Sequence, residues 1–259
     1  MSAPLSTILA DVRPLEAHLP FGVRIGGLTF EILQDANIRK EIDDLFIKHG
    51  MIVFEDVENS DRMQLALSSC FGPLKEHPVK GITRVDADRM PGVVEISARL
   101  DNSGIVEING KQLTHWLPWH FDHAYNDELN RAGVLRAVQI VDEGGITGFL
   151  DGIALYNMID KDLLARIEGK EILYSLATKY SDLKCEGILG DETPEGDKLL
   201  DEVCKAIVAC EPTCSYHHKW KPSDMLIWDN TRMLHAVSGS NPTDVRVMYR
   251  TTIKGDYGH

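Results

Sequence analysis

The sequence has few cysteines and no long apolar run. Its five cysteines are an odd number and none are spaced as C-x-x-C, which excludes a disulfide framework and a zinc knuckle. No stretch of about 18 consecutive apolar residues occurs, so the sequence predicts no transmembrane helix. We therefore expect reduced thiols, no membrane partner and a cytoplasmic location.

Basic residues are also scarce relative to acidic ones. The chain has 27 Lys and Arg against 40 Asp and Glu, a formal net charge of −13, and no run of Lys and Arg. The electrostatic field of a protein with this negative net charge repels polyanions, so we expect no nucleic-acid partner. A small-molecule substrate remains compatible, even an anionic one, because one or two buried arginines can hold it. The sequence is compatible with either a monomer or a homo-oligomer.

Length and composition are those of an ordinary globular domain. The chain has 259 residues, of which 43% are hydrophobic and 26% charged. No internal repeat, low-complexity tract or linker divides it. We therefore expect a single domain over residues 1–259.

The N-terminal part alternates helix and strand patterns. Asp35 is a candidate N-cap for a helix that runs to about residue 49, where Gly50 supplies the stop. Residues 51–54 form an apolar run typical of a buried strand. A second helix is expected over residues 60–70, before a Phe-Gly-Pro turn.

From about residue 93 the sequence pattern changes to short segments rich in β-branched and aromatic residues, separated by turn residues. Several short strands of this kind favour a barrel or a sandwich. Two helical segments interrupt them, one between residues 150 and 174 and one over residues 197–209. The pattern therefore predicts a mainly β fold with flanking helices.

The most distinctive local feature is His120-Phe-Asp122. On a strand, residues i and i+2 point to the same face, so these side chains can place an imidazole and a carboxylate on one cation. His235 follows another predicted strand and is the candidate for a third ligand. Three further histidines could compete as ligands: His123, His217 and His218.

Two histidines and one carboxylate make the facial triad of non-haem Fe(II) oxygenases, which leaves coordination positions open. Zinc is the alternative metal, since a similar donor set also serves hydrolysis. A metal-dependent hydrolase and a non-catalytic small-molecule-binding barrel therefore stand beside the oxygenase as hypotheses.

Two arginines follow His235 on the last predicted strand. Arg246 and Arg250 lie 11 and 15 residues after it, and their spacing of four puts both side chains on one strand face. Either this face is exposed and solvated, or the arginines form a clamp for carboxylates, which a guanidinium group binds bidentately.

These residues resemble the TauD/TfdA (taurine/alpha-ketoglutarate dioxygenase) family of Fe(II)- and 2-oxoglutarate-dependent oxygenases. Other segments agree with the same family over nearly the whole chain: His49–Phe54, Cys70–Leu74, Gly144–Tyr156 and Lys221–Thr231. The resemblance implies a double-stranded β-helix (jelly-roll, cupin-like) core. It also implies that Fe(II), 2-oxoglutarate and O2 are required, and that a C–H bond is hydroxylated with release of succinate and CO2.

The resemblance also implies a role for each matching residue. His120, Asp122 and His235 become the catalytic iron ligands, and Thr147 and Arg246 hold the distal carboxylate of 2-oxoglutarate. Residues implied in substrate binding are Arg250 and His77. Trp116, which lies shortly before the His120 motif, is a further candidate for the substrate pocket by its position, with a core residue as the alternative. Arg250 would bind an anionic group of the substrate, or would instead pair with an acidic residue of the chain.

The sequence departs from the family pattern at several positions, so the resemblance does not identify the substrate. Lys80 stands where the taurine enzyme has a tyrosine, which disfavours taurine. The segment 81–118 is longer than in that enzyme, and the segment 174–215 is shorter than expected. Residues 216–220, Tyr-His-His-Lys-Trp, are interpreted as a structural strand. Desaturation, cyclisation or cleavage remain alternatives to hydroxylation.

Overall fold

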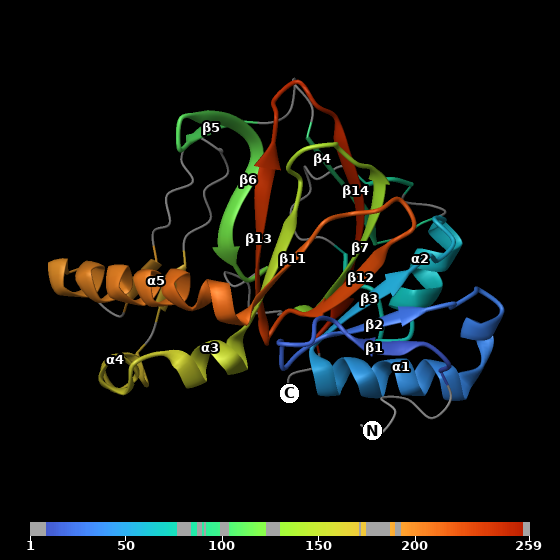
Figure 1. Ribbon diagram of the computed structural model, residues 1–259, viewed down its shortest axis with the longest axis horizontal. Helices are drawn as coiled ribbons and strands as arrows, with labels where there is room; N and C mark the ends of the chain where they lie inside the picture. Colours follow the sequence, from blue (N-terminus) through green and yellow to red (C-terminus); the bar gives the residue numbers. More distant parts are fainter. Residues whose placement is uncertain are drawn as a thin grey trace.

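Two β-sheets and a set of flanking helices make up the structure, which is a computed structural model (Figure 1). The residues that it describes are 9–76, 84–86, 90, 92–98, 104–122, 130–170, 172–174, 187–189 and 193–255. Within these residues, no helix combines the length and apolar character needed to cross a membrane.

The larger sheet has seven strands and carries the two arginines. In spatial order they are β1 (Val12–Pro14), β2 (Val23–Gly26), β3 (Met51–Glu55), β12 (Met225–Asp229), β7 (Asn130–Gln139), β14 (Arg246–Lys254) and β4 (Val93–Ala98). Only β2 and β3 are parallel, and the other neighbours are antiparallel.

The smaller sheet has five strands and carries the two histidine ligands expected from the sequence. In spatial order they are β11 (Ser215–His218), β8 (Thr147–Asp151), β13 (Met233–Ser240), β6 (Lys111–His120) and β5 (Ile105–Ile108). A separate hairpin pairs β9 (Ile172–Tyr174) with β10 (Gly187–Leu189).

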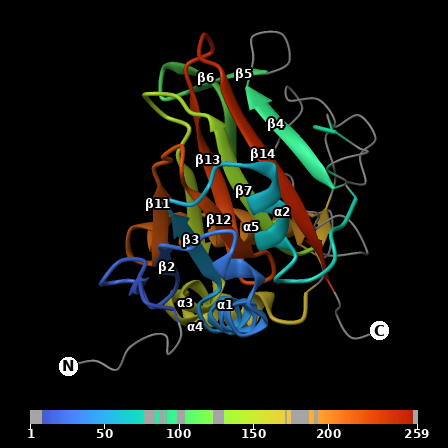
Figure 2. The same ribbon diagram turned by 90° about the vertical axis from the view of Figure 1, so that its right-hand side faces the viewer.

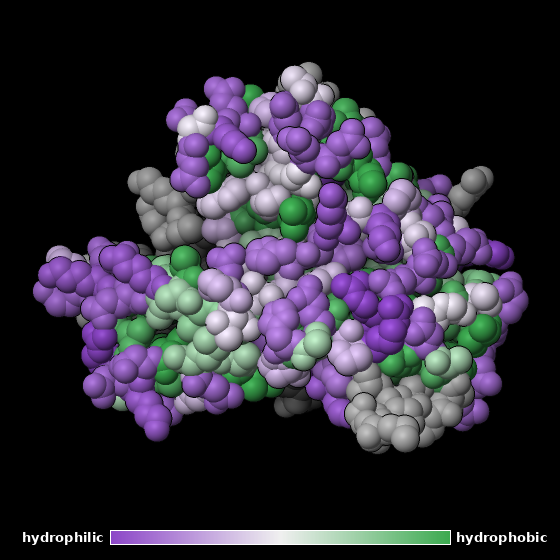
Figure 3. Space-filling view, in the orientation of Figure 1, coloured by the Kyte–Doolittle hydropathy of each residue, from purple (hydrophilic) through white to green (hydrophobic). Residues whose placement is uncertain are grey.

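The helices lie on the outside of the sheets. They are the 3-10 helix η1 (Ile32–Gln34), α1 (Ala36–His49), α2 (Asp61–Ser68), α3 (Gly152–Met158), α4 (Lys161–Ile167) and α5 (Pro194–Cys214). Helix α1 packs on β3 and β12, and α2 packs on β7 and β14 (Figure 2). Apolar side chains also gather on the surface over α3 and α5 (Figure 3).

The predicted start and stop of α1 are confirmed. The side chain of Asp35 accepts a hydrogen bond from the backbone N–H of Asn37 at 2.7 Å, and Gly50 adopts the left-handed conformation with φ of 74°. Helix α2 begins after Ser60, whose side chain caps it, close to the expected start, but it ends at Ser68, two residues before the expected end.

Two predicted helix boundaries were wrong. The segment 150–174 is not one helical insert, because it opens with the end of β8, contains two short helices and closes with β9. Helix α5 starts at Pro194 and ends at Cys214, well beyond the predicted 197–209. Its start was missed because proline fits the first helical turn, where its absent N–H is not needed.

One hydrophobic core lies between the two sheets. Buried side chains from β3, β7, β12 and β14 meet Phe149 of β8 and Met233 of β13, with Trp228 fully buried among them. A second core lies between the larger sheet and helices α1 and α2. Two facing sheets with helices outside confirm the predicted mainly β architecture with flanking helices.

Candidate metal centre

Strand pairing brings two of the predicted ligands face to face. His235 of β13 and His120, the last residue of β6, are Cα partners across the smaller sheet. Their imidazole rings lie 4.1 Å apart between centroids. The ladder shifts register between His235 and Val237, so a β-bulge adjoins the pair.

Asp122 reaches the same point by a different route from the one predicted. Strand β6 ends at His120, so the carboxylate lies beyond the strand and not on its face at i+2. Asn230 fixes this turn: its Oδ1 accepts the Asp122 backbone N–H at 3.1 Å, and its Nδ2 donates to the Asp122 carbonyl at 3.0 Å. No pattern in the sequence singles out Asn230 for this role.

His120, Asp122 and His235 form a cluster whose ligand atoms all lie within 4.8 Å of one another. Nε2 of His235 is 3.4 Å from Oδ2 of Asp122. Nδ1 of His120 lies 2.7 Å from the Pro118 carbonyl, an interaction that places the proton on Nδ1 and leaves Nε2 free to bind a metal. The three donors therefore fit a single metal ion.

The competing histidines are engaged elsewhere or lie outside the described residues. His217 is hydrogen-bonded with Ser215 and faces Glu211, and His218 contacts Tyr216 and Asp224. Neither belongs to the cluster. His123 lies outside the described residues, as do His77 and Lys80.

The charge of Arg250 bears directly on the cluster. Its Nη2 forms an ion pair with Oδ2 of Asp122 at 2.6 Å, and its guanidinium carbon lies 5.4 Å from the centre of the Trp228 ring. Burial alone would raise the pKa of Asp122, but the charge of Arg250 holds it well below its usual value. Burial lowers the pKa of His235 to about 3, which keeps this imidazole neutral and able to bind metal at neutral pH.

A second buried arginine lies near the glycine-rich turn before β8. Arg246 is 4% exposed, and no carboxylate among the described residues forms an ion pair with it. Burial lowers its pKa to about 10, so it remains charged at neutral pH. A Cβ on Gly145 would lie only 3.0 Å from Cδ and Nε of Arg246, so glycine lets the backbone approach this side chain.

Thr147 is buried in the same region and holds one specific partner. Its Oγ1 accepts a hydrogen bond from Nε1 of Trp220 at 2.9 Å. The sequence had suggested only a structural strand for the segment that contains Trp220. Trp116 lies on β6, four residues before His120, half-buried and opposite Ser238.

The family model described as "Taurine catabolism dioxygenase TauD, TfdA family" matches residues 11–186 and 182–252. The chain belongs to the TauD/TfdA family. A TauD/TfdA relative from Sphingobium herbicidovorans, named (S)-phenoxypropionate/alpha-ketoglutarate-dioxygenase, is 28% identical over 95% of this chain and 95% of its own. Alpha-ketoglutarate-dependent 2,4-dichlorophenoxyacetate dioxygenase from Cupriavidus pinatubonensis is 25% identical over 79% of this chain and 84% of its own.

Solved structures agree with the TauD/TfdA fold. The crystal structure of AAD-2 in complex with Mn(II) and N-oxalylglycine superimposes with a TM-score of 0.70 at 23% identity, and the match covers 95% of this chain and 97% of that one. This likeness confirms the predicted jelly-roll core.

Family membership decides between the hypotheses left open by the donor set. The protein is an Fe(II)- and 2-oxoglutarate-dependent dioxygenase that also consumes O2. The zinc-dependent hydrolase and the non-catalytic binding barrel are both set aside. Each of these would explain two histidines and a carboxylate, but neither accounts for the matches along both parts of the chain.

Proposed function

We propose that His120, Asp122 and His235 hold Fe(II), and that the enzyme hydroxylates a C–H bond of a small organic anion. The observation that carries this proposal is the three-residue cluster together with two buried arginines on strand β14 of the other sheet, one of which pairs with Asp122. When bound, iron supplies the oxygen chemistry: one atom of O2 enters the substrate, and the other enters the succinate formed with CO2 from 2-oxoglutarate.

In this proposal, Arg246 and Thr147 bind the distal carboxylate of 2-oxoglutarate. A buried guanidinium with no ion-pair partner among the described residues offers two parallel N–H donors, which match a carboxylate. The Thr147 hydroxyl would donate a further, uncharged hydrogen bond to the same carboxylate. Together they would fix the cosubstrate's orientation and neutralise its charge away from bulk water.

Arg250 has a dual role in the same proposal. It holds Asp122 in its charged form, and its buried Nε has no hydrogen-bond partner in the described part of the chain. That remaining donor would interact with an anionic group of the substrate. His77 and Trp116 complete the proposed substrate pocket: the family resemblance supports His77, and the position of Trp116 on β6 shortly before His120 supports Trp116.

The names of the two relatives narrow the substrate class. One is named for phenoxypropionate and the other for 2,4-dichlorophenoxyacetate, both of which are aromatic ether carboxylates. We infer that an aryloxy or similarly sized carboxylic acid is the substrate class to test first. Hydroxylation of the carbon between the ether oxygen and the carboxyl group would give an unstable hemiacetal-type product whose C–O bond breaks to release a phenol and a 2-oxo acid.

The test is a screen for substrate-stimulated succinate formation with matched pairs of compounds. Each aryloxy acid is compared with its primary amide, which keeps the shape but lacks the charge. We expect several acids to stimulate succinate formation and their amides to fail. His120→Ala should abolish the stimulation, and His217→Ala, on a half-exposed residue outside the cluster, should retain it. Equal stimulation by acids and amides would contradict an anionic substrate.

We further propose that the whole chain acts as one dioxygenase domain in the cytoplasm, with small molecules and no nucleic acid as partners. The net charge of −13 and the scarcity of cysteine support this proposal. Size-exclusion chromatography with light scattering would test for a homo-oligomer.

A further inference from the structure

Trp220 constrains the hydroxyl group of Thr147. The indole nitrogen can only donate a hydrogen bond, and it donates to Oγ1 of Thr147 at 2.9 Å. Both residues are buried, with exposed fractions of 7% for Trp220 and 1% for Thr147. Since one lone pair of the hydroxyl accepts this bond, the hydroxyl proton must point away from the indole.

Trp220 is itself held by a histidine from the adjoining strand. The rings of His218 and Trp220 meet edge to face, with centroids 4.6 Å apart and planes at 88°. His218 lies in strand β11, directly opposite Thr147 in β8. The pairing of these two strands therefore sets the distance between Trp220 and its acceptor.

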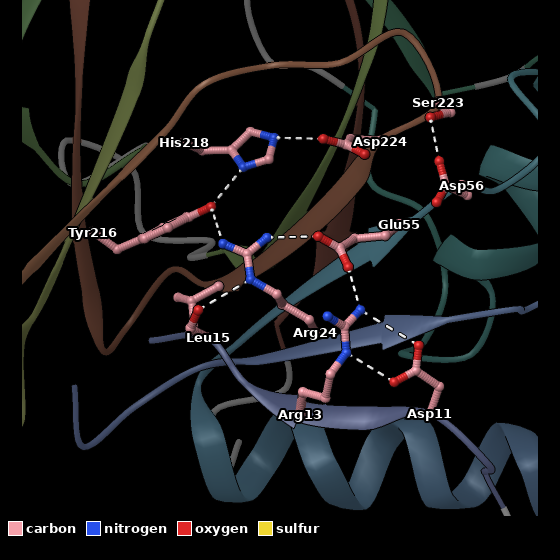
Figure 4. A network of polar contacts seen from close by, with 10 residues as sticks. All are labelled: Asp11, Arg13, Leu15, Arg24, Glu55, Asp56, Tyr216, His218, Ser223 and Asp224. Carbon is pink, nitrogen blue, oxygen red and sulfur yellow. Dashed lines mark hydrogen bonds and ion pairs between the residues drawn. The ribbon is translucent and has the colours of Figure 1, made fainter. Parts of the chain in front are cut away.

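A chain of polar contacts fixes the ring of His218 (Figure 4). Arg24 donates to the hydroxyl of Tyr216 at 3.0 Å, and that hydroxyl lies 2.9 Å from Nδ1 of His218. On the other side, Nε2 of His218 lies 3.4 Å from Oδ2 of Asp224, and both side chains are at most 3% exposed.

One consistent order of donors and acceptors runs along this chain. Because the Tyr216 oxygen accepts from Arg24, its own proton is available for Nδ1 of His218. Burial raises the pKa of Tyr216, so the phenol keeps that proton. The proton of His218 then lies on Nε2, where it faces the carboxylate of Asp224.

We propose that Trp220 is a positioning residue for 2-oxoglutarate: by occupying the acceptor side of the Thr147 hydroxyl, it directs the hydroxyl proton toward the distal carboxylate of the cosubstrate. His218, fixed by Tyr216 and Asp224, holds the indole in place for this role. The inference rests on the proposed function, in which Thr147 binds that carboxylate.

The test is a double-mutant cycle on 2-oxoglutarate affinity. Trp220→Phe removes the N–H but keeps an aromatic ring, and Thr147→Val removes the hydroxyl but keeps the shape. Affinity is measured by calorimetric titration of 2-oxoglutarate into Mn(II)-loaded protein, and Mn(II) affinity is measured in parallel. Trp119→Phe is the matched control, because its indole donates to Glu211 at 3.4 Å and not to Thr147.

Each single variant should weaken 2-oxoglutarate binding by about five- to tenfold, the range expected for one lost or misdirected hydrogen bond. In the Thr147→Val background, Trp220→Phe should have no further effect, because the hydroxyl through which it acts is gone. Mn(II) affinity should stay within about twofold, and Trp119→Phe should bind 2-oxoglutarate as the unmodified protein does.

The possible failures of the two proposals are distinguishable. If Thr147→Val binds 2-oxoglutarate normally, the proposed role of Thr147 is wrong and the inference fails with it. If Thr147→Val weakens binding but Trp220→Phe has no effect, or an additive one, only the inference is overturned. Should Trp220→Phe fail to fold, Tyr216→Phe tests the same chain: a two- to threefold loss that vanishes in Thr147→Val supports the inference, and unchanged affinity overturns it.

Discussion

Nη2 of Arg250 lies 2.6 Å from Oδ2 of Asp122, and the two side chains, 9% and 12% exposed, lie beside the two histidines of the cluster. The carboxylate is thereby kept charged before any metal arrives. A metal ion would supply a second positive charge to the same oxygen. The same ion pair therefore contributes to the stability of the metal-free protein and keeps the Asp122 carboxylate in the charged form that binds a metal.

Arg250→Met should destabilise the metal-free protein by about 3 kcal/mol, because it leaves Asp122 as a buried charge without its partner. Metal binding should recover part of that loss, so the rise in Tm on adding Mn(II) should be larger in the variant than in the unmodified protein. Thermal unfolding with and without Mn(II) measures both effects.

Arg62→Met is the matched control, since Arg62 pairs with Glu58 on the surface and such exposed pairs contribute little to stability. Its Tm and its response to Mn(II) should both be close to those of the unmodified protein. If adding Mn(II) raised the Tm of Arg250→Met and of the unmodified protein equally, the Arg250–Asp122 pair would not be linked to metal binding.

Asn230→Ala should weaken metal binding without removing a ligand. It deletes both hydrogen bonds that hold the backbone of Asp122, so the carboxylate must be ordered when the metal binds. We expect Mn(II) affinity to fall by about 10- to 30-fold, from two bonds of about 1 kcal/mol each. Thr231→Ala, which removes only the hydrogen bond from the Thr231 hydroxyl to Asp229, should bind Mn(II) normally in the same titration.

Arg246→Ala should separate cosubstrate binding from metal binding. Loss of a buried, charged hydrogen-bonding partner should raise the Kd for 2-oxoglutarate by about 100-fold or more. Fe(II) affinity should change by less than about threefold, because Arg246 is not part of the ligand cluster. Parallel losses of both affinities would show that Arg246 maintains the structure of the whole site and does not bind the cosubstrate.

His115 should make the metal-free protein sensitive to mild acid. Burial, together with the charge of Arg246, lowers its pKa from 6.5 to about 4. Between these values the unfolded chain takes up a proton that the folded protein refuses, so the free energy of unfolding falls as the pH falls, by up to about 1.4 kcal/mol per pH unit.

His115→Asn removes this proton uptake, and asparagine tolerates the positive φ of 55° found there. Urea unfolding of the metal-free variant between pH 7 and pH 4 should therefore give a shallower loss of stability than in the unmodified protein. Measurement at pH 8 checks that the variant is folded. Parallel stability curves for the two proteins would rule out His115 as a source of the acid sensitivity.

Much of the site could be predicted because its residues are close in sequence or carry distinctive chemistry. The His-x-Asp pair, the distal histidine and the spacing of Arg246 and Arg250 each suggested a function from the sequence. The structure gathers His120, Asp122 and His235 into one cluster. It also buries both arginines on β14.

The supporting contacts could not be predicted, because they depend on pairings between strands far apart in the chain. Asn230 meets Asp122 over 108 residues, and Trp220 meets Thr147 over 73. No local pattern encodes such distances. The same applies to Arg250, whose choice between an acidic residue and a ligand depends on where the turn after β6 places Asp122.

The predicted ends of helix α5 were wrong because residues around them were misleading. The C-terminal end of α5 runs through Pro212, a residue that normally suggests a break, and the helix continues to Cys214. The expected range 197–209 does lie within this helix. Its ends were set by Thr193, which caps the first turn, and by the pairing of the next strand with β8.

The most direct test of the central claim is the absorption spectrum of the anaerobic protein with Fe(II) and 2-oxoglutarate. If His120, Asp122 and His235 hold iron with positions left open, the keto acid will chelate the metal and produce a weak visible charge-transfer band. Arg246→Ala should need far more 2-oxoglutarate to reach the same band, and His235→Ala should lose it. Fe(II) bound to the intact protein without any band at saturating 2-oxoglutarate would contradict the account.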